Sequence, residues 1–280
     1  MTLLCRNEID IVREMVEFHL SMGVDTIIAT DNASDDGTRE VLQDYQRRGS
    51  VILLCEPELT HMQSSWVTRM ARIAYQDLGA DWVIHSDADE FWWPSSGTLK
   101  DEFERIGADT CVVRVARSNF TPVHRPDNAP CSPFFATMTF RDRVSLNAQG
   151  KPLPGKVCHR GMPDIEVADG NHHVSVKGKR CEAESTDGIH ILHFPIRTCE
   201  QYERKISEGA QALLRNKDRL PSTGRTWLEI YERHWLTGSF RQHFMGLCLT
   251  TEQCAAKVRA GDLIEDERLK TLLGRLLGRT

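Results

Sequence analysis

The sequence has no long apolar run, no paired cysteines and no excess of positive charge. No stretch of about 18 apolar residues occurs within the 280 residues, so we expect no membrane-spanning helix. The nine cysteines stand singly, without a Cys-x-x-Cys pair, which argues against a zinc knuckle or a disulfide framework and favours reduced thiols. The chain has 35 basic and 40 acidic residues, and this net charge of −5 argues against a nucleic-acid-binding protein. The N-terminus becomes charged at Arg6, too early for a secretory signal, so we expect a cytoplasmic protein.

Strand and helix patterns alternate through the first hundred residues. Short apolar runs predict strands, and apolar residues at helical spacing between them predict helices. This alternation is typical of α/β proteins that have a mostly parallel central sheet flanked by helices. The predicted strands are residues 2–5, 25–30, 51–55 and 82–85, and the predicted helices are residues 9–21, 38–48 and 66–78.

The pattern changes after about residue 100. We predict an α/β domain over residues 1–197 and a helical C-terminal region over residues 198–280. A segment rich in proline, asparagine and aspartate at residues 122–133 predicts a long loop. The further predicted strands are residues 110–117, 135–140, 155–159, 172–176 and 189–194, and the predicted helices are residues 200–216, 227–236 and 252–277.

Paired carboxylates follow the predicted strand at residues 82–85. In extended chain the side chains of Asp87 and Asp89 would point to the same side, so both could contact one ion. Unmatched, the two carboxylates would repel each other, and a hard divalent cation such as Mn²⁺ or Mg²⁺ relieves that repulsion. The pattern predicts a metal site, and a solvated acidic turn is the alternative.

A second polar loop follows the predicted strand at residues 25–30. Open parallel sheets bind ligands at the carboxyl ends of their strands, which makes the loop at residues 31–38 a candidate nucleotide pocket. The same loop could also be an ordinary turn in which Ser34 or Asp36 caps the next helix.

These motifs together resemble the family 2-like glycosyltransferases with the GT-A fold. The resemblance rests on residues 5–8 (CRNE), 23–25 (GVD), 31–38 (DNASDDGT) and 87–91 (DADEF), and extends more loosely through residues 190–205. It implies a metal-dependent enzyme that moves a sugar from a nucleotide-sugar, most often a UDP-sugar, to a glycan or lipid-linked acceptor. A family 2-like fold would carry these motifs at the strand ends of a GT-A domain.

The resemblance also implies roles for individual residues. Asp87 and Asp89 would be the DxD motif that binds Mn²⁺ or Mg²⁺ on the donor's diphosphate, and His193 is the first choice for a third ligand. The nucleotide pocket would be formed by Arg6, Asn7, Glu8, Asp31, Asn32 and Asp87, and Arg197, Lys205 and Lys156 could reach the diphosphate.

The catalytic base is the least constrained role. An inverting enzyme needs a carboxylate that takes the proton from the acceptor hydroxyl. Many family 2 members use the aspartate of a Glu-Asp pair, which this sequence has only at residues 265–266, too far along the chain. Asp164, Glu166 and Asp169 fall in roughly the expected region, and Glu90 lies next to the metal pair. Of these, we predict Asp164 or Glu90 as the base.

Two other functions compete with this interpretation. A nucleotidyltransferase acting on sugar phosphates would usually carry a glycine-rich phosphate loop near its first strand, and residues 3–8 contain no glycine. An inactive nucleotide-sugar-binding module is the second alternative, and the intact Asp87 and Asp89 argue against it. The leucines and basic residues of the segment 263–277 predict either packing on the protein itself or peripheral contact with the inner membrane face.

Overall fold

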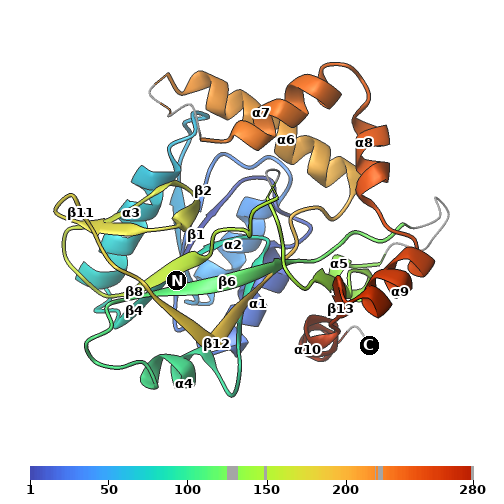
Figure 1. Ribbon diagram of the computed structural model, residues 1–280. Coiled ribbons are helices and arrows are strands. Elements are labelled where there is room, and N and C mark those ends of the chain that lie inside the picture. The colour runs from blue at the N-terminus through green and yellow to red at the C-terminus, as the bar shows by residue number, and fades with distance from the viewer. Residues whose placement is uncertain (125–131, 148–149, 218, 220–222, 279–280) are drawn as a thin grey trace. The chain divides into compact units, whose positions relative to one another are not determined.

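The computed structural model describes residues 1–124, 132–147, 150–217, 219 and 223–278, in two compact units (Figure 1). Unit 1 contains residues 1–117 and 154–192, and unit 2 contains residues 118–153 and 193–280. The predicted loop at residues 122–133 falls largely outside the described residues.

Unit 1 is built on a large central sheet. Its strands lie side by side in the order β3-β2-β1-β4-β8-β6-β12-β5. A small second sheet has the order β11-β10-β9. The strands are β1 (Thr2–Cys5), β2 (Ile27–Asp31), β3 (Val51–Cys55), β4 (Trp82–Asp87), β5 (Glu90–Pro94), β6 (Val112–Asn119), β8 (Lys156–Arg160), β9 (Ile165–Val167), β10 (Val174–Val176), β11 (Lys179–Arg180) and β12 (Glu184–His193).

The central sheet is mixed rather than uniformly parallel. β1 pairs in parallel with β2 and β4, and β2 pairs in parallel with β3, as the alternating pattern predicts. β8 runs antiparallel to both β4 and β6. The predicted α/β class, with a central sheet flanked by helices, is confirmed, and its parallel part is the region that contains β1 to β4.

Helices cover the sheet of unit 1. They are α1 (Val12–Ser21), α2 (Thr38–Arg47), α3 (Gln63–Gln76) and α4 (Leu99–Glu104). The buried face of α3, including Met70 and Ala71, packs against Ile28 of β2 and Val83 of β4 in one apolar cluster. Because successive strand residues point to opposite faces, the burial of Ile27 and Ala29 beside Ile28 shows that both faces of β2 are covered.

Local sequence sets where α2 begins. Gly37 has a φ of 101°, a left-handed conformation that residues with a Cβ rarely adopt. The carboxylate of Asp36 then accepts hydrogen bonds from the backbone N–H and hydroxyl of Thr38, at 3.0 and 2.6 Å. The loop therefore turns sharply into the helix directly after the carboxyl end of β2.

Unit 2 contains mainly helices and one two-stranded sheet. Two of the sequence predictions are wrong here. The predicted strand at 135–140 forms the short helix α5 (Phe134–Thr137) and then β7 (Phe140–Asp142), which pairs antiparallel with β13 (Leu263–Glu265). The predicted helix at 252–277 is interrupted, because Gly261 ends α9 in a left-handed conformation with a φ of 84°. The other helical elements are α6 (Cys199–Arg215), α7 (Arg225–Ile230), a π-helical turn (Tyr231–Trp235), α8 (Phe240–Leu247), α9 (Thr251–Ala260) and α10 (Arg268–Leu276).

The apolar face of α10 packs within its own unit. Leu269 and Leu273 are buried, while Leu276 is exposed. This is the packing alternative predicted for the segment 263–277, and contact with a membrane stays a prediction. Across the described parts of the chain, no helix is both long and apolar enough to span a membrane.

Candidate functional site

Two acidic strand ends lie at the same edge of the sheet in unit 1. β1 runs between β2 and β4, and the strand register pairs Cys5 with Asp31 and Leu4 with Asp87. Asp31 is the last residue of β2 and Asp87 is the last residue of β4. Asp31 and Asp87 therefore lie at strand ends on either side of β1.

The Asp31 carboxylate is fully buried at the end of β2. Its Oδ2 atom accepts hydrogen bonds from Arg39 Nε at 2.8 Å and from the backbone N–H of Ser34 at 3.3 Å. The neighbouring carboxylate raises the pKa of Arg39, so that this guanidinium stays charged. The second oxygen, Oδ1, is buried and has no hydrogen-bond partner among the described residues. A buried acceptor without a donor costs about 1–3 kcal/mol, which makes this oxygen a candidate ligand contact.

Arg6 and Asn32 connect the loops around Asp31. Arg6 Nη1 donates to the carbonyl oxygens of Asn32 and Ala33, at 2.7 Å each. Asn32 Nδ2 donates to the carbonyl oxygens of Glu56 and Glu58, at 3.0 and 2.6 Å. These two predicted pocket residues thus fix the backbone that forms the walls of the strand end.

The loop after β1 is tied to the loop after β2. Asn7 accepts a hydrogen bond from the backbone N–H of Asp35 at 2.9 Å, and the Glu8 N–H donates to Thr38 Oγ1 at 2.9 Å. Asn7 and Ala33 have φ values of 55° and 51°, which are unusual for residues other than glycine. Such strain is concentrated at functional sites in proteins, and here it lies in both loops of the predicted pocket.

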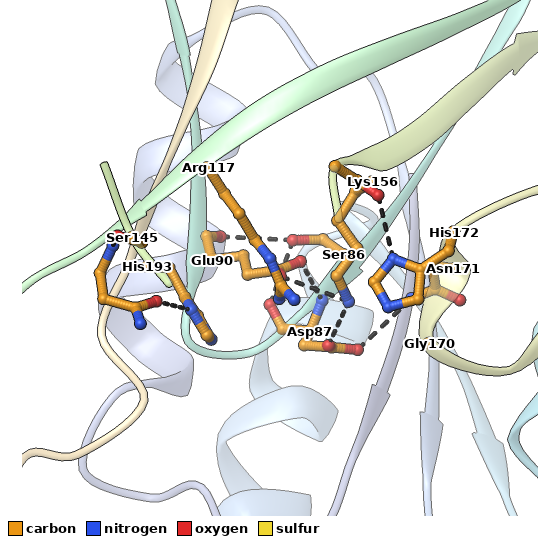
Figure 2. Close-up of polar contacts among 12 residues, drawn as sticks. Ser86, Asp87, Glu90, Arg117, Ser145, Lys156, Gly170, Asn171, His172 and His193 are labelled. Atoms are coloured by element: carbon orange, nitrogen blue, oxygen red, sulfur yellow. Dashed lines mark hydrogen bonds and ion pairs between the residues drawn. The ribbon is translucent and has the colours of Figure 1, made fainter. Parts of the chain in front are cut away.

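Asp87 is contacted by a buried lysine and by the Asn171 amide (Figure 2), and also by the Gln63 amide. Its Oδ2 atom lies 2.6 Å from Lys156 Nζ on β8, whose side chain is only 2% exposed. Its Oδ1 atom lies 3.4 Å from both Gln63 Nε2 and Asn171 Nδ2. One third of the Asp87 side chain is exposed, so the carboxylate still faces solvent at the end of β4.

The ion pairs continue inward from Asp87 to Glu90 and Arg117. Glu90 Oε1 lies 3.3 Å from Lys156 Nζ and 3.2 Å from Arg117 Nη1, and Glu90 Oε2 accepts from the Asp87 N–H at 3.3 Å. The Glu90 side chain is fully buried. Burial opposes the charged form of Lys156, but the carboxylates of Asp87 and Glu90 raise its pKa above the usual value, so the ammonium is charged. Both Glu90 oxygens are engaged inside the protein, whereas a base must reach an acceptor hydroxyl.

Asp89 lies in a turn rather than in extended chain. β4 ends at Asp87, residues 88–89 form a turn, and β5 begins at Glu90. The assumption of extended chain, from which the sequence places the two aspartates on one side, therefore does not hold. Asp89 is also buried, with 2% of its surface exposed.

The other predicted base, Asp164, lies on the surface. It precedes β9 in a left-handed conformation with a φ of 57°, and 60% of its side chain is exposed. Its carboxylate lies 3.8 Å from Lys177 Nζ. Asp164 and Glu90 stay predictions for the catalytic base.

Further polar residues lie at the Asp87 end. The 3-10 turn Asp169–Asn171 brings the Asn171 amide to Asp87, and its Oδ1 atom is buried and has no hydrogen-bond partner in the described chain. His172 Nδ1 lies 2.9 Å from the Gly155 carbonyl oxygen, and burial lowers the pKa of His172 to about 4. Arg117 and Gln63 complete the set. No local motif in the sequence singles out Asn171, Arg117 or Gln63.

The remaining predicted residues belong to unit 2. His193 Nδ1 lies 2.7 Å from Asn119 Oδ1. Arg197 is buried, and its Nη1 atom donates to the Phe194 carbonyl oxygen at 3.0 Å. Lys205 is half-buried on α6. Their roles toward a metal or a diphosphate stay predictions.

Among the described residues, no three histidine, cysteine, aspartate or glutamate side chains are grouped so that they could hold one metal ion. Mg²⁺ and Mn²⁺ also accept amide oxygens as ligands. The prediction that Asp87, Asp89 and His193 bind a metal therefore stays a prediction.

Comparisons with known proteins add independent information on the N-terminal part. The model of glycosyltransferase family 92 matches residues 6–131, which carry both Asp31 and Asp87. No curated protein matches the chain. Among solved structures, S. aureus TarS (residues 1–349) is 11% identical, with a TM-score of 0.42 over 85% of this chain and 72% of that one. The mannosyltransferase PcManGT from Pyrobaculum calidifontis, solved with GDP-Man and Mn²⁺, is 16% identical, with a TM-score of 0.42 over 99% of this chain and 78% of that one.

The family match bears out the expectation of a glycosyltransferase in the segment that it covers. It names family 92, whereas the sequence motifs resemble family 2-like enzymes. The match to residues 6–131 thus supports the enzyme class and leaves the family 2-like detail unconfirmed.

Proposed function

We propose that this protein transfers a sugar from a nucleotide-sugar, with the donor bound at the carboxyl ends of β1, β2 and β4. The observation that carries the proposal is the neighbouring position of Asp31 and Asp87 on either side of β1, within the segment that matches a glycosyltransferase family. A UDP-sugar is the donor that we infer first, and a glycan or a lipid-linked molecule is the acceptor.

The base of the nucleotide would bind at Asp31. The free Oδ1 atom of this carboxylate can accept a hydrogen bond from a ring N–H, such as that of uracil. Arg39 holds the other oxygen, so the carboxylate is fixed before a ligand arrives. Arg6 and Asn32 keep the surrounding loops in place.

The diphosphate would bind near Asp87, together with a divalent cation. The residues present fit a hard cation: one third of the Asp87 side chain is exposed, and among the described residues the buried Asn171 Oδ1 atom has no hydrogen-bond partner. A bound Mn²⁺ or Mg²⁺ would neutralise the charge that develops on the leaving nucleoside diphosphate. Asp89 and His193 are the further ligands that we infer from the sequence.

The chain's own residues would orient the donor and keep charge balanced. The buried ion pairs of Lys156, Glu90 and Arg117 hold the Asp87 carboxylate in one orientation. We further propose inversion at the anomeric carbon, with Asp164 or Glu90 as the base, and Arg197 and Lys205 as the diphosphate contacts that we infer from the sequence.

A calorimetric panel of nucleotide-sugars tests the proposal. UDP-, GDP- and dTDP-sugars are titrated into the protein with Mn²⁺ and again with EDTA. We expect one class to bind with Mn²⁺ and to lose most of its affinity in EDTA. If no nucleotide-sugar binds under either condition, the proposal is wrong.

Variants at the β4 end test the cation part separately. The Asp87→Asn/Asp89→Asn double variant should lose cation-dependent donor binding, because both carboxylates become neutral. Asp44→Asn is the matched control, since Asp44 is a surface residue on α2 that pairs only with neighbouring arginines in the described structure. Undiminished donor binding by the double variant would contradict a metal at this strand end. Analysis of the products then separates glycosyl transfer from nucleotidyl transfer.

A further inference from the structure

Lys156 occupies the place where a cation would neutralise Asp87. Its side chain is 2% exposed, and its ammonium lies 2.6 Å from Asp87 Oδ2 and 3.3 Å from Glu90 Oε1. Figure 2 shows the lysine between these two carboxylates. A buried lysine is unfavourable unless it is paired, and these carboxylates supply the pairing. The protein therefore holds a positive charge of its own at the end of β4.

The ion pairs around Asp87 join equal numbers of positive and negative side chains. Asp87 and Glu90 contribute two negative charges, and Lys156 and Arg117 contribute two positive charges. A divalent cation that approaches Asp87 meets a carboxylate whose charge is already matched. The electrostatic attraction that would draw the cation in is correspondingly weak.

The two oxygens of Asp87 differ in how firmly they are held. Oδ2 lies 2.6 Å from Lys156 Nζ, whereas Oδ1 lies 3.4 Å from the amides of Gln63 and Asn171. A cation that binds this carboxylate therefore competes with the ammonium for it.

We propose that Lys156 is a resident counter-cation that competes with the divalent cation for Asp87, so that cation and donor bind cooperatively. Without a donor, the ammonium satisfies Asp87 and the cation binds weakly. A diphosphate brings negative charge that can satisfy both the ammonium and the cation, which removes the competition. This inference rests on the proposed nucleotide-sugar site and assigns Lys156 as a positioning residue for Asp87.

Binding of Mn²⁺ alone tests the competition without measuring activity. Free Mn²⁺ is followed by electron paramagnetic resonance during titration of the full chain. We expect the wild-type protein to bind Mn²⁺ weakly and Lys156→Met to bind it 5- to 150-fold more tightly, the range common for coupling between two ligands. Lys100→Met is the control, because Lys100 is an exposed lysine whose ammonium pairs with Asp25. Equal or weaker Mn²⁺ binding by a folded Lys156→Met protein would overturn the proposal.

A second variant separates the loss of the Lys156 ammonium from a change in the net charge of the cluster. Lys156→Met/Glu90→Gln removes one positive and one negative charge, so that the net charge of the cluster is unchanged. We expect tighter Mn²⁺ binding in this variant too, because Asp87 has lost its ammonium partner. If Mn²⁺ binds as weakly as in the wild-type protein, the pairing with Lys156 does not control cation affinity.

The wild-type protein provides a test that needs no substitution. Mn²⁺ titrations are compared in the absence and presence of saturating UDP, and UDP should raise the Mn²⁺ affinity by the same factor of 5 to 150. Tight Mn²⁺ binding that does not depend on UDP would overturn the inference while leaving the proposed function intact. If UDP and every other nucleotide fail to bind, the proposed function fails, and the Mn²⁺ titration of Lys156→Met still decides the competition.

Discussion

The two acidic strand ends of unit 1 are built in different ways. At the end of β2, Asp31 is held by Arg39 and Ser34, both within eight residues along the chain, and one carboxylate oxygen has no partner among the described residues. At the end of β4, Asp87 is held by Lys156, 69 residues away, within a network that also contains Glu90 and Arg117. The β2 site is formed by residues that are close in sequence, and one oxygen of Asp31 has no hydrogen-bond partner among the described residues. The β4 site is formed by residues from strands that are distant in sequence, and its ion pairs join two acidic and two basic side chains.

This difference fits a division of tasks in binding a nucleotide-sugar. A neutral base needs a fixed acceptor for its N–H groups, and a buried free oxygen supplies one. A diphosphate carries negative charge and needs cations, which a cluster that already holds lysine and arginine can supply or exchange. The following predictions test whether the two ends differ as the contacts indicate.

The largest expected effect is on stability at the β4 end. Glu90→Gln removes the carboxylate that Lys156 and Arg117 share, and breaking a buried pair typically costs about 3–5 kcal/mol. Asp31→Asn should cost less, because its partner Arg39 is one third exposed and can be solvated. Urea unfolding of both variants measures the two losses.

The same comparison bears on the catalytic base. If Glu90→Gln folds with wild-type stability and yet loses transfer activity, Glu90 acts in catalysis rather than in the buried network. Equal losses of stability in Glu90→Gln and Asp31→Asn would contradict the contrast between the two strand ends.

We expect acid to lower the free energy of unfolding through a buried histidine on β8, the strand that also contains Lys156. His159 lies on β8, three residues from Lys156, and burial lowers its pKa to about 4. Because the unfolded pKa is near 6.5, this histidine contributes stability that is fully present above pH 6.5 and is lost as the pH falls toward 4. The loss is at most about 3 kcal/mol. Urea midpoints between pH 7 and pH 4 should fall in the wild-type protein, and His159→Gln should flatten that profile.

Arg39 at the β2 end provides the contrast in this experiment. The neighbouring Asp31 raises its pKa, so its charge does not change over this range. A pH profile that is unaltered by His159→Gln would show that this residue does not carry the acid sensitivity.

The free oxygen of Asp31 should affect donor affinity more than folding. In Asp31→Asn, one of the two oxygen positions becomes an amide NH₂, which must face either Arg39 or the nucleotide base. We expect donor affinity to fall about 5- to 150-fold, equivalent to about 1–3 kcal/mol, as measured by calorimetry. Arg39→Ala is the matched variant, because it leaves Oδ1 in place. If Arg39→Ala lowers donor affinity as much as Asp31→Asn, the free oxygen is not the contact.

The smallest expected effect is at Asn32. Its side chain connects the β2 loop to the carbonyl oxygens of Glu56 and Glu58, in a partly exposed position. Asn32→Ala should lower the unfolding free energy by about 1 kcal/mol and donor affinity only slightly, because the alanine leaves the backbone contact with Arg6 in place. A loss of donor binding as large as that of Asp31→Asn would instead make Asn32 a direct contact.

Sequence reasoning succeeded where structure is locally encoded. The predicted strands at residues 2–5 and 51–55 match β1 and β3, because each is an apolar run bounded by polar loops. The Asp31 loop was found for the same reason, since Asp36, Gly37 and Thr38 interact with one another.

The contacts and elements that the sequence did not predict depend on pairing between strands that are distant in sequence. No local pattern places Lys156 beside Asp87, because that contact follows from the antiparallel pairing of β8 with β4. The turn at residues 88–89 likewise replaced the extended chain that the aspartate spacing suggested. At residues 252–277 the helical pattern predicts one helix, whereas Gly261 ends α9 and β13 then pairs with β7.

The central claim is that β1, β2 and β4 together form one nucleotide-sugar site. A crystal structure of the protein with the nucleotide-sugar that binds most tightly in the panel and Mn²⁺, with the manganese located by anomalous scattering, tests it most directly. We expect the base against Asp31 Oδ1, and the diphosphate and manganese beside Asp87 and Asn171. A nucleotide bound elsewhere, or a manganese ion that contacts neither residue, would contradict the account.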